Sequence, residues 1–174
     1  FRFSPDFADA LAYTAHLHAD HLRKKSQIPY ISHLLGVASL VIEHGGTEEE
    51  AIAALLHDSS EDQASQMGGA EVLRERLERR FGHKVVELID GCTDAETFPK
   101  PGWRERKESF IASVESASES VCLIVAADKL HNARSIQNDR RHMGPEVWEI
   151  FRKPKEKTLW YYRSLVDILK KRLS

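Results

Sequence analysis

The ten residues AALLHDSSED, residues 53–62, begin as an uninterrupted apolar segment and end in His57, Asp58, Glu61 and Asp62. Such an apolar segment is typical of a buried helix, whereas three carboxylates so close together repel one another. Each helical residue advances by about 100°, so Glu61 shares a face with His57, and Asp62 shares one with Asp58. A bound cation would relieve the repulsion. The segment therefore predicts a core helix with a cation site at its carboxyl end.

The composition predicts one compact domain over residues 1–174, of which 41% are apolar. Because 25 basic residues nearly cancel 27 acidic ones, we expect neither a nucleic-acid nor a membrane-surface partner. No apolar run approaches the roughly 18 to 20 residues of a membrane span, which predicts a soluble, cytoplasmic protein. Cys92 and Cys122 lack a CxxC spacing and suit a reducing compartment.

Apolar positions recur at spacings of three and four residues, which predicts an all-α fold. The first helix is expected to begin at the cap Ser4 and to run to about Arg23, and the second to end at Gly45 and Gly46. Thr47 and Glu50 form a capping box for the helix that ends in HDSSED. Further helices are predicted over residues 70–82, 83–90, 103–117, 119–136 and 146–174, the last interrupted at Pro154. The sequence thus predicts a bundle of about seven to nine helices.

His57 and Asp58 supply only two ligands, and a firm metal site needs more. His33 follows PYIS at the start of the second predicted helix, and Asp128 lies in VCLIVAADKLHN, where an apolar run turns polar. A set of two imidazoles and two carboxylates suits Mn²⁺, with Fe²⁺ or Zn²⁺ as alternatives. Such an ion lowers the pKa of bound water, and Glu61 and Asp62 could then orient that water or move its proton.

Each of these residues also has a purely structural interpretation. A His or Asp at a helix end often caps the helix or is simply solvated. Asp128 could be held by a salt bridge to Lys129 or Arg134, which would offset the cost of burying its carboxylate. Taken singly, the residues leave both interpretations open.

Together, four stretches resemble the HD superfamily of metal-dependent phosphohydrolases, and within it the hydrolase domain of RelA/SpoT-type proteins and the free-standing small alarmone hydrolases. They are RKKSQIPYISHLLGVA, AALLHDSSED, AADKLHNARSI and KTLWYYRSLV, in the family's order and at roughly its spacing. The resemblance implies an HD-type helical domain with one Mn²⁺ held by His33, His57, Asp58 and Asp128. It further implies Glu61 and Asp62 as the catalytic acidic pair, and Arg23, Lys24, Asn132 and Ser135 as contacts to the nucleotide.

The resemblance implies an alarmone 3′-pyrophosphohydrolase that converts (p)ppGpp, the adenine analogue (p)ppApp, or both to a 5′-nucleotide and pyrophosphate. Arg23 and Lys24 could neutralise the phosphates of such a substrate through charge-assisted hydrogen bonds. The alternatives are an HD-type 5′-nucleotidase acting on (deoxy)nucleoside monophosphates and a non-catalytic nucleotide-binding module. Base preference, activity on nicotinamide nucleotides and the choice between monomer and homodimer stay open.

The segment between the HD and ED pairs departs from the family pattern. The family usually has Thr-Val there and a Thr after the acidic pair, whereas this chain has Ser59, Ser60 and Gln63. Ser59 keeps a hydroxyl, but Ser60 loses an apolar anchor, so we expect different packing under the acidic pair. These 174 residues leave no room for a synthetase domain, so we expect the protein to degrade its signal rather than make it.

Overall fold

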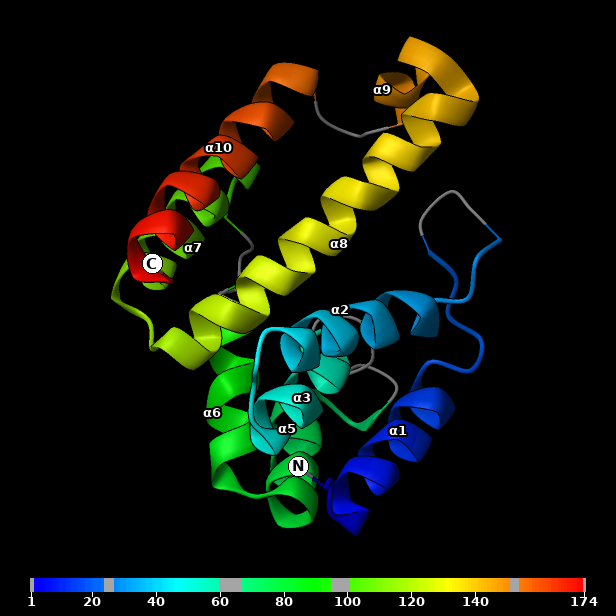
Figure 1. Ribbon diagram of the computed structural model, residues 1–174, viewed down its shortest axis with the longest axis vertical. Coiled ribbons are helices and arrows are strands. Elements are labelled where there is room, and N and C mark those ends of the chain that lie inside the picture. The colour runs from blue at the N-terminus through cyan, green and yellow to red at the C-terminus, as the bar shows by residue number, and fades with distance from the viewer. Residues whose placement is uncertain (1, 24–26, 60–66, 95–100, 151–153, 174) are drawn as a thin grey trace. The chain divides into compact units, whose positions relative to one another are not determined.

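The computed structural model describes residues 2–23, 27–59, 67–94, 101–150 and 154–173, without the side chains of residues 149 and 150. Within these ranges the regular elements are helices and one isolated β-bridge, which confirms the predicted all-α fold (Figure 1). None of the described helices is long and apolar enough to cross a membrane. The chain divides into two compact units, Phe1–Thr93 and Asp94–Ser174, each with its own helices and buried side chains.

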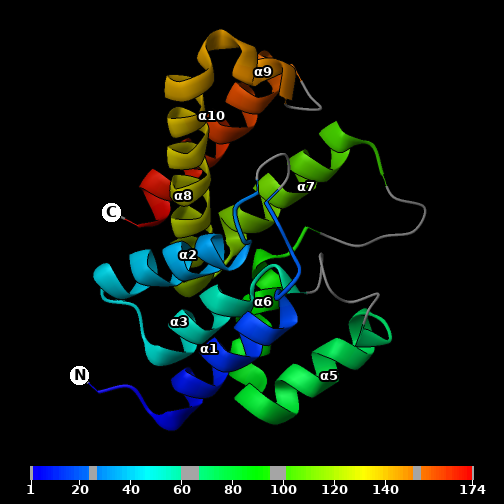
Figure 2. The same cartoon turned by 90° about the vertical axis from the view of Figure 1, so that its right-hand side faces the viewer.

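Helix α3 is the central element of the first unit. It packs against α1, α2 and α6, and α5 packs against α6 (Figure 2). All residues from Ala51 to Leu56 in α3 are buried, as expected for a segment that is apolar on every side. The helices of this unit are α1 (Pro5–Leu17), α2 (Ile31–Glu43), α3 (Glu48–Leu56), α5 (Ala70–Phe81) and α6 (His83–Cys92). The carboxyl end of α3, which His57 follows, is therefore held by a packed core.

The start of α3 is fixed by the capping box that the sequence predicts. The Thr47 hydroxyl accepts a hydrogen bond from the Glu50 amide at 3.3 Å, and the Thr47 amide donates to the Glu50 carboxylate at 2.7 Å. The preceding Gly46 lies so close to α2 that an added Cβ would sit 2.5 Å from Cγ1 of Val41. The connection between α2 and α3 is consequently tight, and it joins the helix that carries His33 to the helix that His57 and Asp58 follow.

Helix α1 begins as predicted, with Ser4 as its cap, but the expected end near Arg23 is wrong. The helix ends at Leu17, and the chain then turns into an isolated bridge between Leu22 and Pro29. His18 at the end of α1 is buried, and its ring stacks on that of Tyr30. Packing between residues distant in the chain thus overrides a local pattern that favours a longer helix.

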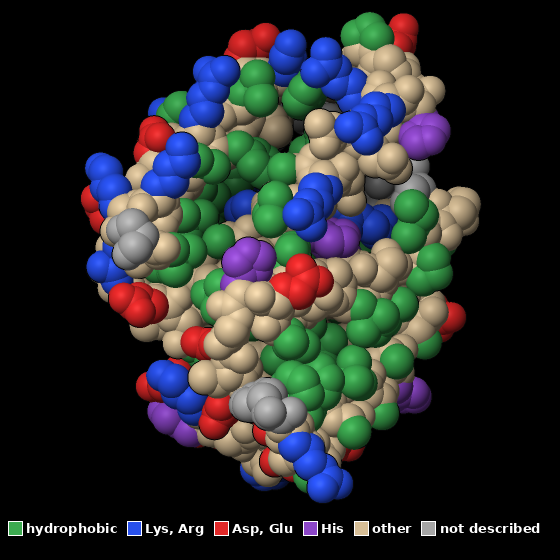
Figure 3. Space-filling view, in the orientation of Figure 1, with side chains coloured by type: hydrophobic (Ala, Val, Ile, Leu, Met, Phe, Trp, Pro, Cys, Tyr) green, Lys and Arg blue, Asp and Glu red, His purple; other side chains and the backbone are tan. Residues whose placement is uncertain are grey.

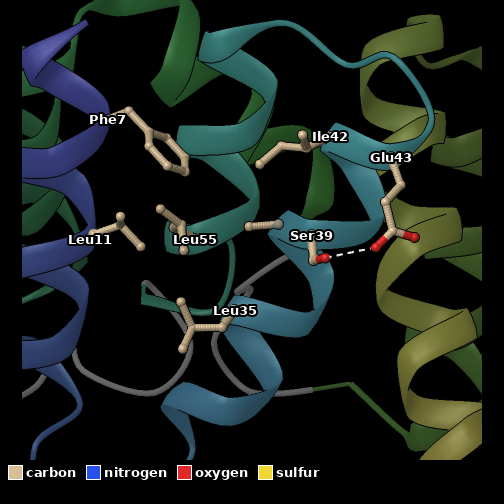
Figure 4. A pocket seen from close by; sticks show the side chains of 8 residues that line it. Phe7, Leu11, Leu35, Ser39, Ile42, Glu43 and Leu55 are labelled. Carbon is tan, nitrogen blue, oxygen red and sulfur yellow. Dashed lines mark hydrogen bonds between the residues drawn. The ribbon is translucent and has the colours of Figure 1, made fainter. Parts of the chain in front are cut away.

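An apolar hollow of about 230 Å³ lies among α1, α2 and α3. Phe7, Leu11, Leu35, Ile42 and Leu55 line it (Figure 4), and apolar side chains gather on this face of the unit (Figure 3). Ser39 and Glu43 also line the hollow, and no histidine is among the described residues around it. Phosphate hydrolysis requires several converging charged groups, so this largely apolar hollow does not have the character of a phosphohydrolase active site.

Helix α8 is the long element of the second unit, and it extends beyond the predicted end at Ile136. It stops at Gly144, whose positive φ of 73° is readily adopted by glycine at a helix end. The predicted interruption at Pro154 is confirmed, because the last helix begins at Lys155. The unit contains α7 (Trp103–Ser116), α8 (Glu119–Met143), the 3-10 turn η2 (Gly144–Glu146), α9 (Val147–Ile150) and α10 (Lys155–Arg172). Helix α10 packs against both α7 and α8.

Candidate metal centre

Three of the four predicted metal ligands come together in the first unit. His33 is the third residue of α2, and His57 and Asp58 directly follow the last residue of α3. Oδ2 of Asp58 lies 3.5 Å from Nε2 of His33 and 3.2 Å from Nε2 of His57. The two imidazoles are buried, whereas the Asp58 side chain is 21% exposed. One donor atom from each residue lies within 4.8 Å of the others.

The orientation of the His57 ring shows that this cluster suits a cation. Nδ1 of His57 lies 2.8 Å from the carbonyl oxygen of Ala54. Because a carbonyl can only accept a hydrogen bond, Nδ1 is the donor, which leaves Nε2, the nitrogen nearest Asp58, as the atom that could bind a cation. Metal-binding histidines are commonly fixed in this way through their second nitrogen. Two imidazole nitrogens and a carboxylate oxygen form a donor set that fits a borderline divalent cation.

Asp128, the fourth predicted ligand, lies in α8 of the second unit and is almost fully buried. Its carboxylate accepts hydrogen bonds of 2.5 Å from Nζ of Lys129 and from the side-chain amide of Asn132. Burial opposes the charge on Lys129, but Asp128 and Tyr161 together raise the pKa of this lysine well above its ordinary value. The salt bridge between Asp128 and Lys129, which the sequence analysis gave as an alternative structural role for Asp128, is present. A carboxylate has about four lone-pair sites, so this pairing is compatible with metal binding, which stays a prediction.

The predicted nucleotide contacts are only partly described. Arg23 is half-buried, and its backbone amide donates to the Ile28 carbonyl at 2.9 Å beside the bridge. Asn132 and Ser135 are half-buried on α8, and Asn132 holds Asp128. Lys24, Glu61 and Asp62 lie outside the residues that the structure describes. The substrate-binding and catalytic roles of these residues stay predictions.

Tyr30 is a site residue that the sequence analysis missed. Its hydroxyl donates a hydrogen bond of 2.5 Å to Oδ2 of Asp58, the atom that also faces the two imidazoles. The contact joins residues 28 positions apart, so helical periodicity could not reveal it. The available signal was the position of a tyrosine three residues before His33 in the PYISH segment.

Ser59 is fully buried, and its hydroxyl donates to the carbonyl of Leu56 at 2.6 Å. This hydrogen bond satisfies a carbonyl in the last turn of α3. The hydroxyl therefore supports the end of the helix that precedes the predicted acidic pair.

A stack of aromatic rings lies beside the ligand cluster. The ring of Tyr30 stacks on that of His21 at a centroid distance of 4.0 Å, and His18 extends the stack. Nδ1 of His18 lies 3.1 Å from Nδ1 of His21. Burial, with smaller contributions from His21 and His57 and opposed by Asp58, lowers the pKa of His18 to about 4. His18 is therefore a neutral ring at pH 7.

An all-α fold in which a helix ends in an adjacent His–Asp pair, with a second buried histidine beside it, is typical of HD-domain proteins. The sequence profile of the HD domain family matches residues 10–153, a range that includes residues of both units. The chain belongs to the HD domain family.

Several curated relatives carry the functional name guanosine-3′,5′-bis(diphosphate) 3′-pyrophosphohydrolase. MESH1 of Xenopus tropicalis is 34% identical over 143 residues, which are 80% of this chain and 72% of that protein. MESH1 of Homo sapiens is 32% identical with the same coverage. A protein of that functional name from Aquifex aeolicus is 29% identical over 148 residues, but these are only 20% of its length.

Two solved structures are similar in fold. One, described as a metazoan ortholog of SpoT that hydrolyzes ppGpp and plays a role in starvation responses, matches with a TM-score of 0.79 and 27% identity. The match covers 99% of this chain and 89% of that chain. The protein lmo0812 from Listeria monocytogenes EGD-e matches with a TM-score of 0.69 and 28% identity, over 79% of this chain and 83% of its own.

Proposed function

We propose that this protein is a metal-dependent 3′-pyrophosphohydrolase of ppGpp, of its adenine analogue ppApp, or of both. The observation that carries the proposal is the cluster of His33, His57 and Asp58, oriented for a cation within an HD-family chain. The name shared by the relatives supports the substrate class. We further propose that the protein acts in the cytoplasm, as a monomer or a homodimer.

In this proposal His33, His57 and Asp58 of the first unit, together with Asp128 of the second, hold one Mn²⁺. The two units then form a single functional domain over residues 1–174. When bound, the cation supplies a nucleophile at neutral pH and stabilises negative charge on the phosphate. The mixed nitrogen and oxygen donors support Mn²⁺, although Fe²⁺ and Zn²⁺ accept the same ligands.

The chain's own side chains position the reactants. Glu61 and Asp62, each four residues after a member of the His–Asp pair, orient the attacking water and accept its proton. Arg23 and Lys24 bind the phosphates, whereas Asn132 and Ser135 contact the sugar and its phosphates. The water oxygen attacks the phosphorus attached to the ribose 3′ oxygen, and the bond between that phosphorus and the 3′ oxygen breaks. The 3′ oxygen takes a proton, and the products are pyrophosphate and a 5′-nucleotide.

The test is product analysis by anion-exchange chromatography after incubation of the purified protein with ppGpp and ppApp in parallel. Each reaction contains Mn²⁺, and a matched sample contains excess chelator. We expect chelator-sensitive release of pyrophosphate and the 5′-diphosphate nucleotide from at least one substrate. If both nucleotides stay intact while Mn²⁺ is bound, the proposed activity is wrong, and release of inorganic phosphate from deoxynucleoside monophosphates would indicate a 5′-nucleotidase.

A further inference from the structure

The Tyr30 hydroxyl contacts the candidate metal centre at Oδ2 of Asp58. It donates to Oδ2 of Asp58, and the same oxygen faces Nε2 of His33 and Nε2 of His57. The rotation of the Asp58 side chain is therefore constrained by a donor from outside the ligand set. A carboxylate whose position is fixed before the cation arrives loses less conformational freedom when it binds that cation.

The Tyr30 ring is itself held in place on several sides. His21 stacks on it with an interplanar angle of 16°, and His33 meets it edge-on at a centroid distance of 5.5 Å. The backbone amide of Tyr30 donates to the carbonyl of His21 at 2.8 Å. Because backbone and ring are both fixed, the hydroxyl has little freedom to leave Asp58.

We propose that Tyr30 is a positioning residue of the metal centre, whose hydroxyl fixes Asp58 for binding the cation, with His21 as the support of the Tyr30 ring. This inference rests on the metal site of the proposed function, but not on the identity of the substrate. Tyr30 is not proposed to touch the nucleotide or to transfer a proton.

The test compares two substitutions that each remove one phenolic hydroxyl from the first unit. Tyr30→Phe keeps the stacked ring but removes the bond to Asp58. Tyr13→Phe is the matched control, because the buried Tyr13 hydroxyl has no hydrogen-bond partner among the described residues. The measurement is Mn²⁺ affinity, from electron paramagnetic resonance of free Mn²⁺ during titration of the whole chain.

We expect Tyr30→Phe to weaken Mn²⁺ binding about tenfold, as is typical when a partner of a metal ligand is removed, and Tyr13→Phe to leave it unchanged. The Mn²⁺ concentration that gives half-maximal activity should rise by the same factor, with a much smaller change in kcat at saturating Mn²⁺. His21→Ala, which removes the stacked ring without touching Asp58, should weaken binding in the same direction and gives a second route if Tyr30→Phe folds poorly.

Equal Mn²⁺ affinity in the Tyr30→Phe and Tyr13→Phe proteins would overturn the inference, as would a wild-type protein that binds no Mn²⁺. The titration contains no nucleotide, so it separates this inference from the proposed activity. A protein that binds Mn²⁺ through Tyr30-supported Asp58 but leaves ppGpp and ppApp intact would support the inference and refute the proposed function.

Discussion

At the scale of single residues, the candidate site depends on which atoms carry protons. The carbonyl of Ala54 fixes the proton of His57 on Nδ1, so Nε2 is available as a ligand. The Tyr30 hydroxyl donates a hydrogen bond to Oδ2 of Asp58 and limits the rotation of that carboxylate. These two hydrogen bonds orient a ring nitrogen and a carboxylate oxygen that lie side by side and that we propose as ligands.

Glu61→Gln should lower kcat by about 100-fold or more, because the amide cannot accept the proton of the attacking water. Metal content, measured by atomic absorption, should stay at the wild-type level, since Glu61 is not proposed to be a ligand. Glu75→Gln, at an exposed position on α5, is the control and should leave kcat unchanged. Normal turnover in the Glu61→Gln protein would remove Glu61 from the mechanism.

His18 should make the metal-free protein less stable in acid. Its pKa is about 4 in the folded protein and near 6.5 when unfolded, so the unfolded chain binds the proton first as the pH falls. The stability contributed by neutral His18 is complete above about pH 7 and is lost on acidification toward pH 4, by up to about 3 kcal/mol. His21 and His57 oppose protonation of His18, whereas Asp58 favours it.

Urea unfolding at pH 7 and pH 4.5 tests this expectation. In His18→Phe, which keeps a ring in the stack, the fall in unfolding free energy between the two pH values should be smaller than in the wild type. Other groups also titrate in this range, so the comparison between the two proteins is the decisive quantity. An identical fall in both would show that His18 does not contribute.

At the scale of helices, the elements could be predicted where a local side chain fixes their ends. Thr47 and Glu50 start α3, Ser4 starts α1, and Gly82 ends α5, as the sequence indicates. The end of α1 could not be predicted, because the residues that follow it contact residues further along the chain, as in the stacking of His18 on Tyr30. A capping hydrogen bond can be predicted from residues that are neighbours in the sequence. Ring packing between residues that are distant in the sequence cannot be predicted in this way.

Thr47→Ala should lower the unfolding free energy by about 1 kcal/mol, because the amide of Glu50 loses its acceptor at the start of α3. Thr47→Ser keeps the oxygen and should stay close to the wild type. Denaturant unfolding with both variants in the same buffer makes the comparison. Equal destabilisation by the two substitutions would point to loss of the threonine methyl group rather than of the cap.

The same distinction applies to the site. His33, His57 and Asp58 could be selected from the sequence because each is a ligand-type residue at the end of an apolar helix, and the structure brings them together. Tyr30 could not, since its role depends on a contact between the start of one helix and the end of another. Partners of ligands are harder to predict than ligands because tyrosine has many structural uses.

At the scale of the whole molecule, the proposed ligand set draws on both units. Asp128→Asn should reduce Mn²⁺ affinity by at least about tenfold if the second unit supplies the fourth ligand. Asp139→Asn, at an exposed position on the same helix, is the matched control and should bind Mn²⁺ like the wild type. Titration with a fluorescent competing chelator measures both proteins.

Thermal unfolding provides an independent measure of the contribution of Asp128 to Mn²⁺ binding. Mn²⁺ at 100 times its dissociation constant should stabilise the wild-type protein by about 2.7 kcal/mol and raise its Tm, with a smaller rise for Asp128→Asn at the same concentration. Unchanged Mn²⁺ affinity and an unchanged Mn²⁺-dependent rise in Tm in the Asp128→Asn protein would confine the metal centre to the first unit.

The bridge between Leu22 and Pro29 limits how this protein can acquire new specificity. Arg23, a predicted nucleotide contact, follows one end of the bridge, and Tyr30 follows the other. Hydrogen bonds from the amides of Arg23 and Tyr30 tie this part of the backbone together. An insertion or deletion here would shift Arg23 and the support of Asp58 at the same time. We therefore expect specificity in this segment to diversify by side-chain replacement rather than by changes in length, a constraint that directed evolution with both kinds of library would reveal.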